Sequence, residues 1–95
     1  MLVELKKLNI INEGYKRKIF SDKIFVNSNH VISIRDYQGA SDFLISEGPG
    51  YYNGEKFSLL RVNSGSEIEE IIVYGSSSEI YAAFSQPTGK RLLND

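Results

Sequence analysis

The sequence predicts a mostly β domain: an antiparallel sheet or partly open barrel of five to six strands, with one short C-terminal helix. Three observations support this fold class. Apolar residues occur in short runs rather than in long helical stretches. Clusters of Gly, Asn and Ser separate these runs, as turns separate strands. A helix-start signal appears only late in the chain, at Ser76–Glu79.

The chain has the length and composition of a single globular domain. It has 95 residues, of which 41% are hydrophobic and 24% are charged, and these values are typical of globular proteins. We expect residues 1–84 to form the domain and residues 85–95 to form a mobile tail. Because a core of this size gives marginal stability, self-association into a homo-oligomer is also expected.

The first strands are expected in the N-terminal third of the chain. Leu2–Leu8 is interpreted as a strand, but Leu2, Leu5 and Leu8 would also stack along a short helix, so both interpretations stay open. The elements that follow are, in order, a turn at Asn12–Gly14, a strand at Tyr15–Phe20, a break at Ser21-Asp22 and a strand at Ile24–Val26.

His30–Tyr37 is the clearest strand pattern in the sequence. Its alternation places Ile32 and Ile34 on one face, which we interpret as the core side. His30 and Asp36 then lie at opposite ends of that face, roughly 20 Å apart at about 3.3 Å per residue. The two side chains are therefore too far apart to form a hydrogen bond within this strand.

Residues 38–54 contain the densest turn chemistry, with four glycines and one proline. Phe43–Ile45 is interpreted as a short edge strand within this segment. Asn53-Gly54 is a strong signal for a tight turn. The hairpin that it predicts would place Tyr51 and Tyr52 opposite Glu55 and Lys56.

The C-terminal third predicts a hairpin followed by a helix. Phe57–Val62 and Ile68–Tyr74 are two strands joined by Asn63–Ser66, and the second has apolar residues in succession, which favours cover on both faces. Ser76 and Glu79 have the spacing of a capping box. The apolar residues that follow are spaced for a helix from about 77 to 84.

The residue inventory excludes several catalytic and metal chemistries. The chain has no cysteine and one histidine, His30, so thiolate sites and zinc-binding histidine pairs are absent. Neither a nucleophile elbow nor a phosphate-binding loop occurs. We therefore expect no catalytic residues, no metal site and no cofactor, and we predict that the chain is not an enzyme.

Two features indicate where the protein acts. The absence of cysteine favours an intracellular protein, and Glu4, Lys6 and Lys7 interrupt any apolar signal-peptide core. No run approaches the roughly 20 apolar residues that cross a bilayer. A cytoplasmic protein without membrane contact is therefore expected.

Nucleic-acid binding is one of two functions that the inventory leaves open. Residues 1–23 carry a net charge of +3, whereas the remainder is acidic and the whole chain has a net charge of −1. Basic residues mixed with aromatic ones are typical of surfaces that bind single strands. The contacts expected on this hypothesis are Tyr15, Lys16, Arg17, Lys18 and Arg35. A solvated strand face is the alternative interpretation of the same residues.

Protein binding is the second function and the one that the sequence favours. The glycine-rich segment combines exposed-loop chemistry with aromatic residues of the kind that anchor interfaces. The interface predicted on this hypothesis consists of Phe43, Leu44, Tyr51 and Tyr52. Packing of these residues over one end of a small barrel is the alternative. Edge strands could also pair with a partner or with a second copy.

A pattern of short segments also resembles a known family. The segments are Leu5–Asn9, Ile24–Asn27, Val31–Ile34, Leu59–Gly65, Ile68–Val73 and Ser76–Ile80. Together they resemble the small FlbD-type proteins of flagellar gene clusters, although Ile10 stands where that family has Gly and residues 38–54 have no counterpart. The resemblance implies a β-rich fold and an accessory role. The composition also resembles that of small phage-encoded proteins.

Overall fold

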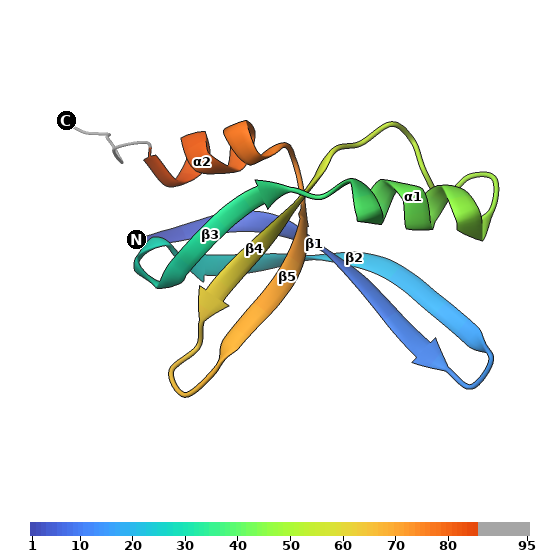
Figure 1. Cartoon of the computed structure of the whole chain (residues 1–95), viewed down its shortest axis with the longest axis horizontal. Coiled ribbons are helices and arrows are strands. Elements are labelled where there is room, and N and C mark those ends of the chain that lie inside the picture. The colour runs from blue at the N-terminus through green and yellow to red at the C-terminus, as the bar shows by residue number, and fades with distance from the viewer. Residues whose placement is uncertain (86–95) are drawn as a thin grey trace.

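The computed structural model describes residues 1–85 as a five-stranded antiparallel open sheet with two helices (Figure 1). The elements are β1 (Leu2–Glu13), β2 (Lys16–Asn27), a 3-10 turn (Ser28–His30), β3 (Val31–Asp36), α1 (Gln38–Glu47), β4 (Phe57–Asn63), β5 (Ile68–Tyr74) and α2 (Ser77–Ser85). The strand order is β2-β1-β5-β4-β3, so β2 and β3 are the two edges. The mostly β fold class is confirmed. The expected tail lies, from residue 86 onward, outside the described residues.

The β1–β2 hairpin is longer and more regular than the sequence predicts. Both strands have 12 residues, and the region 2–8 is strand rather than helix. The turn lies at Gly14 and Tyr15, one position later than predicted, where Gly14 has a φ of 65°. Ser21 and Asp22 do not break β2, because they pair with Leu8 and Lys7 of β1. Cross-strand pairing overrides the polar character of this dipeptide.

The sheet is buried by two clusters of apolar side chains on opposite faces. The α2-side cluster consists of Leu5, Val26, Leu60, Val73 and Ile80. The α1-side cluster consists of Leu8, Ala40, Leu44 and Phe57. Successive residues of β5 pack in different clusters: Val73 lies in the α2-side cluster and Ile72 packs against the α1-side cluster. The prediction that this strand is covered on both faces is therefore confirmed.

The β1–β2 hairpin changes its buried face halfway along its length. Leu5 packs in the α2-side cluster, whereas Leu8 packs in the α1-side cluster. These residues point to opposite sides of β1 because side chains alternate along a strand. Between them, β1 pairs with β5 over just two registered positions, Lys7 with Val73 and Leu8 with Ile72. The hairpin thus crosses the rest of the sheet at this point and leaves it as a projecting arm (Figure 1).

Residues 38–47 form α1, and the predicted edge strand at Phe43–Ile45 is wrong. Ala40, Ser41 and Leu44 fall on one helical face and are the buried residues of this helix. The helix ends at Gly48, whose φ of 129° favours glycine. Residues 48–56 have no regular strand, so the hairpin predicted around Asn53-Gly54 is also wrong. The aromatic residues here pack on a helix rather than on a sixth strand.

Two details of β3 differ from the sequence prediction. The strand begins at Val31, while His30 belongs to the preceding 3-10 turn. Its register with β4 shifts between Val31 and Ser33, as in a β-bulge. Val31 and Ile34 therefore pack toward the α2-side cluster, and Ile32 is 50% exposed rather than on the core side.

Candidate functional site

Both helices begin at the same end of the β3-β4-β5 part of the sheet (Figure 1). β3 and β5 both run antiparallel to β4, which lies between them, so they end at the same end of the sheet, and each is followed by a helix. Backbone hydrogen bonds fix the two junctions: the Tyr37 N–H donates to the Phe57 carbonyl, and the Gly75 N–H donates to the Lys56 carbonyl. Two helix N-termini, each with a positive dipole end, are thereby placed beside the start of β4.

Two carboxylates and one hydroxyl accept backbone hydrogen bonds at the N-terminus of α2. The Glu79 N–H donates to Ser76 Oγ, and Glu79 Oε1 accepts from the Ser76 N–H at 2.8 Å, so the predicted capping box is confirmed. Asp36 Oδ1, from the end of β3, accepts from the Ser77 N–H at 2.8 Å. These backbone hydrogen bonds lower the pKa of both Asp36 and Glu79 below their ordinary values. Negative charge therefore already satisfies this helix end.

The N-terminus of α1 has no such cap. Tyr37 occupies the N-cap position without a side-chain hydrogen bond, and no acidic residue lies in the first turn. The first N–H groups of an α-helix have no partner within the helix. The positive dipole end of α1 therefore has no side-chain cap, and the Tyr37 ring lies close to Gly39 in its first turn.

A polar cleft of about 570 Å³ lies between the two helix starts and the loop that precedes β4. Its charged lining residues are Lys56, Asp36 and Glu55. Ser41 also lines it and is only 4% exposed. The remaining lining residues are Tyr37, Gln38, Tyr52, Gly54, Phe57, Ser76 and Ser78.

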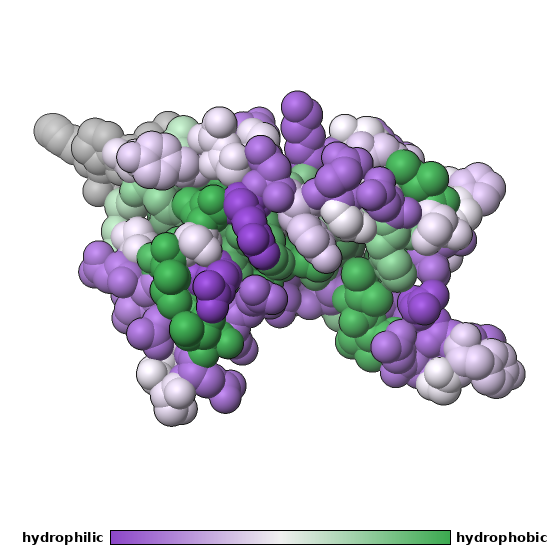
Figure 2. Space-filling view, viewed as in Figure 1, coloured by the Kyte–Doolittle hydropathy of each residue, from purple (hydrophilic) through white to green (hydrophobic). Residues whose placement is uncertain are grey.

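A second groove, of about 540 Å³, runs between β3 and α2. Its lining has no charged side chain and consists of Ser28, Val31, Ile32, Ser33, Ile34, Ser77, Ser78, Tyr81 and Phe84. Tyr81 is 67% exposed and Ile32 is 50% exposed along this groove. Figure 2 shows apolar surface in the region below α2. The sequence prediction missed this groove because it assigned Ile32 to the core.

The four residues of the predicted protein interface do not form one exposed surface. Leu44 is 2% exposed and lies in the α1-side cluster. Phe43 and Tyr52 are partly buried against the same cluster. Tyr51 is exposed in the loop that follows α1. Apart from Tyr51, these residues pack α1 against the open sheet, whereas the alternative interpretation had placed them over one end of a barrel.

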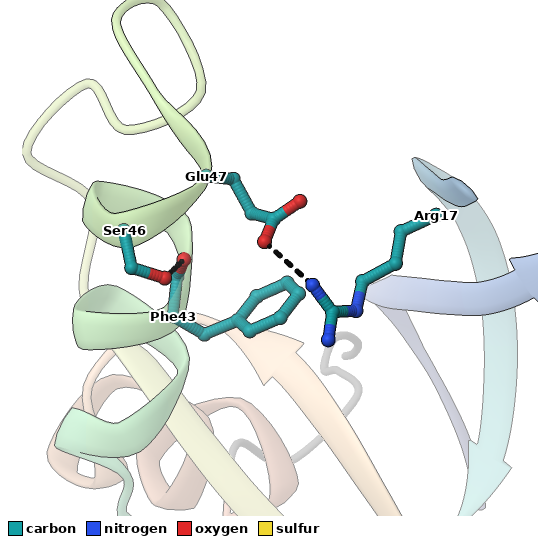
Figure 3. A network of polar contacts seen from close by, with 4 residues as sticks. All are labelled: Arg17, Phe43, Ser46 and Glu47. Carbon is teal, nitrogen blue, oxygen red and sulfur yellow. Dashed lines mark hydrogen bonds and ion pairs between the residues drawn. The ribbon is translucent and has the colours of Figure 1, made fainter. Parts of the chain in front are cut away.

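The residues of the predicted nucleic-acid surface are separated as well. Arg17 turns toward α1, where its Nη1 lies 2.9 Å from Glu47 Oε2 and its guanidinium lies 5.4 Å from the centre of the Phe43 ring (Figure 3). Lys16 and Lys18 lie on the other face of β2, and Tyr15 is 96% exposed at the turn. Arg35 lies on β3, the opposite edge of the sheet. Tyr15, Lys16 and Lys18 therefore remain together on the arm, where Lys18 Nζ lies 5.5 Å from the centre of the Phe20 ring.

His30 and Asp36, the histidine and the carboxylate of the predicted strand His30–Tyr37, do not meet in the structure. His30 and Asp36 lie at the two ends of β3, and the Asp36 carboxylate is bound to the start of α2. Within residues 1–85, no three His, Asp or Glu side chains gather closely enough to hold a metal ion. Neither helix of the described part is long and apolar enough to span a membrane.

Comparison with known proteins adds no relative to these observations. The chain matches no protein-family model, and no curated protein or solved structure is significantly similar to it. The candidate sites therefore depend on the geometry of the polar cleft and of the apolar groove.

Proposed function

We propose that this chain is a non-catalytic accessory domain that binds another protein through the groove between β3 and α2. The observation that carries the proposal is the uncharged lining of that groove, with Tyr81 and Ile32 largely exposed beside it. Aromatic side chains next to apolar pockets supply much of the binding energy in protein interfaces. An accessory role is also what the resemblance to FlbD-type proteins implies.

The partner that fits this groove is an extended segment with apolar and hydroxyl side chains. β3 is an edge strand, so its outer backbone groups are open to a further strand. The opposite edge, β2, carries Lys16, Lys18 and Lys23, which oppose strand pairing. The charged residues of β3, Arg35 and Asp36, lie at its end, and the Asp36 carboxylate accepts a hydrogen bond from the Ser77 N–H.

The bulge in β3 limits where a partner strand would pair. Because the register shifts between Val31 and Ser33, regular backbone pairing is expected along Ser33–Asp36. The exposed Ile32 and Tyr81 side chains would then contact apolar residues of the same segment. A charged residue in the middle of that segment would lose its hydration without gaining an ion pair.

Photo-crosslinking in the native host tests this proposal. With benzoylphenylalanine in place of Tyr81, we expect one discrete adduct with a partner protein, and the further change Ile32→Lys should abolish it. The matched control places the same group at Tyr51, which is 49% exposed but lies outside the groove. Equal adducts at both positions, or none at Tyr81, would contradict the proposal. A crosslink between two copies of this chain would show that the groove binds a second copy rather than another protein.

The alternative function, nucleic-acid binding, is supported by the exposed Tyr15, Lys16 and Lys18 of the projecting arm. Fluorescence anisotropy with labelled DNA and RNA across a salt series separates the two functions. Affinity that falls steeply with salt and is weakened by Lys18→Glu would favour the arm, because displaced counterions govern phosphate contacts. Anisotropy that does not change with added protein at low salt would exclude nucleic-acid binding and leave protein binding as the proposed function.

A further inference from the structure

We propose that two copies of this chain join through open strand edges: the outer edge of β2 in the arm of one copy pairs with the open edge of β5 in the other. The arm is the part of the β1–β2 hairpin from Asn9 to Phe20. This contact lies outside the groove between β3 and α2, so it goes beyond the proposed function.

The first observation is that β5 has an open edge along its first half. All of β5 pairs with β4, but only Ile72 and Val73 pair with β1 on the other side. Figure 1 shows that the arm diverges from the β4–β5 hairpin beyond this point. Within residues 1–85, the backbone of Ile68–Ile71 therefore has no strand on that side. Backbone N–H and C=O groups at such an edge are a template for a further strand.

The second observation is that the arm carries an open edge of its own and is held by α1. β2 pairs only with β1 in the described part of the chain, so its outer edge is open. On the α1 side, Ile10 and Ile19 pack on the α1-side cluster, and Arg17 forms the ion pair with Glu47. The arm would lose these contacts if it turned toward β5 of its own chain. The open edge of β5 is therefore left for a strand from another chain.

Charge decides which strand fits this edge. Glu67 and Glu69 lie along it two positions apart, and neither forms an ion pair within the described residues. Lys16 and Lys18 have the same spacing on β2, and they form no ion pair there either. Side chains two positions apart share one face of a strand. Antiparallel pairing that places Lys16 opposite Glu69 therefore places Lys18 opposite Glu67, and both pairs of opposite charge lie on one face.

The same charges select β2 with β5 over the other pairings of these two edges. Two β2 edges would bring lysines together, and two β5 edges would bring glutamates together, which is unfavourable in each case. Because every copy has both edges, a two-fold axis forms the β2–β5 contact twice and closes a dimer. Ile68, between the two glutamates and 52% exposed, loses water-accessible surface in the same contact.

Sedimentation velocity of the whole chain, in a dilution series at low salt, tests this arrangement. We expect the mass of two chains and a dissociation constant that rises with salt, because salt screens exposed charges. Two charge-reversal variants are compared, Lys16→Glu with Lys18→Glu and Glu67→Lys with Glu69→Lys. Each alone should weaken association about tenfold or more, because like charges then meet in both contacts.

An equimolar mixture of the two charge-reversal variants supplies the decisive comparison. In a mixed dimer each reversed edge meets the reversed edge of the other variant, so lysine again faces glutamate in both contacts. The mixture should therefore associate as tightly as the parent chain, and this recovery also shows that both variants fold. A parent chain that stays monomeric, or a mixture that associates no more tightly than each variant alone, overturns the proposal.

Two further variants serve as controls. Lys23→Glu makes the same charge change on β2 but outside the arm, so it should leave the dimer unchanged. Ile32→Lys alters the groove of the proposed function and should also leave the dimer unchanged. Equal weakening by Lys23→Glu would show that only net charge matters. A dimer that Ile32→Lys removes and the charge reversals do not would exclude the β2–β5 contact.

Discussion

At the residue scale, two carboxylates determine how α2 begins. Glu79 accepts from the Ser76 N–H, three residues earlier, and this partner follows from the sequence alone. Asp36 accepts from the Ser77 N–H, 41 positions later, and no local pattern could predict that contact. Neighbouring positive charge from Lys56 contributes to the lowered pKa of both groups.

These lowered pKa values predict that the fold loses stability in acid. Each group titrates at a lower pH when folded than when unfolded, so its contribution is present above the unfolded pKa, about 4, and is lost as the pH falls through the folded pKa. Thermal melts between pH 6 and pH 2.5 should show a drop in Tm that is smaller in the double variant Asp36→Asn, Glu79→Gln. Parallel Tm curves for the two chains would refute this assignment.

At the element scale, α1 shows how a local signal can be outweighed. Ala40, Ser41 and Leu44 have helical spacing, and a helix could have been inferred from them. Gly39 in the first turn and the Gly48-Pro49-Gly50 cluster after the helix favoured a loop with a short strand instead. The helix forms because the α1-side face of the sheet needs apolar cover, which Ala40 and Leu44 supply.

Leu44 should therefore be among the most important residues of α1 for stability. Leu44→Ala removes a side chain that is 2% exposed in the α1-side cluster, and we expect a loss of about 2–5 kcal/mol in the free energy of unfolding. The neighbouring Ile45 is 58% exposed, so Ile45→Ala should change stability by less than about 1 kcal/mol. Chemical denaturation measures both, and equal losses would argue against this placement of the helix.

At the scale of the whole molecule, the β1–β2 hairpin joins the two apolar clusters. The open end of the hairpin, with Leu5 and Val26, packs in the α2-side cluster. The half nearer the turn, with Ile10 and Ile19, packs on the α1-side cluster. The distal half, from Asn9 to Phe20, has β-sheet partners only within the hairpin. Contacts such as the Arg17–Glu47 ion pair connect this arm to α1.

Hydrogen exchange should divide this hairpin into two regions. Amides around Lys7 and Leu8, where β1 pairs with β5, should exchange only by global unfolding, whereas those near the turn at Gly14 should exchange by local opening. Arg17→Gln should speed exchange in the arm and leave Tm nearly unchanged, because an exposed ion pair contributes little to stability. Uniform protection along all of β1 would be inconsistent with a separately opening arm.

The sequence by itself determined the mostly β class, the β4–β5 hairpin and the capping box of α2. These features depend on neighbouring residues, whose alternation, turn chemistry and hydrogen bonding act over a few positions. Only the tertiary structure decided which face of each strand is buried, because that depends on elements far away in the chain. It placed Leu5 and Leu8 in different clusters, exposed Ile32 beside α2 and buried Ser41 in the polar cleft.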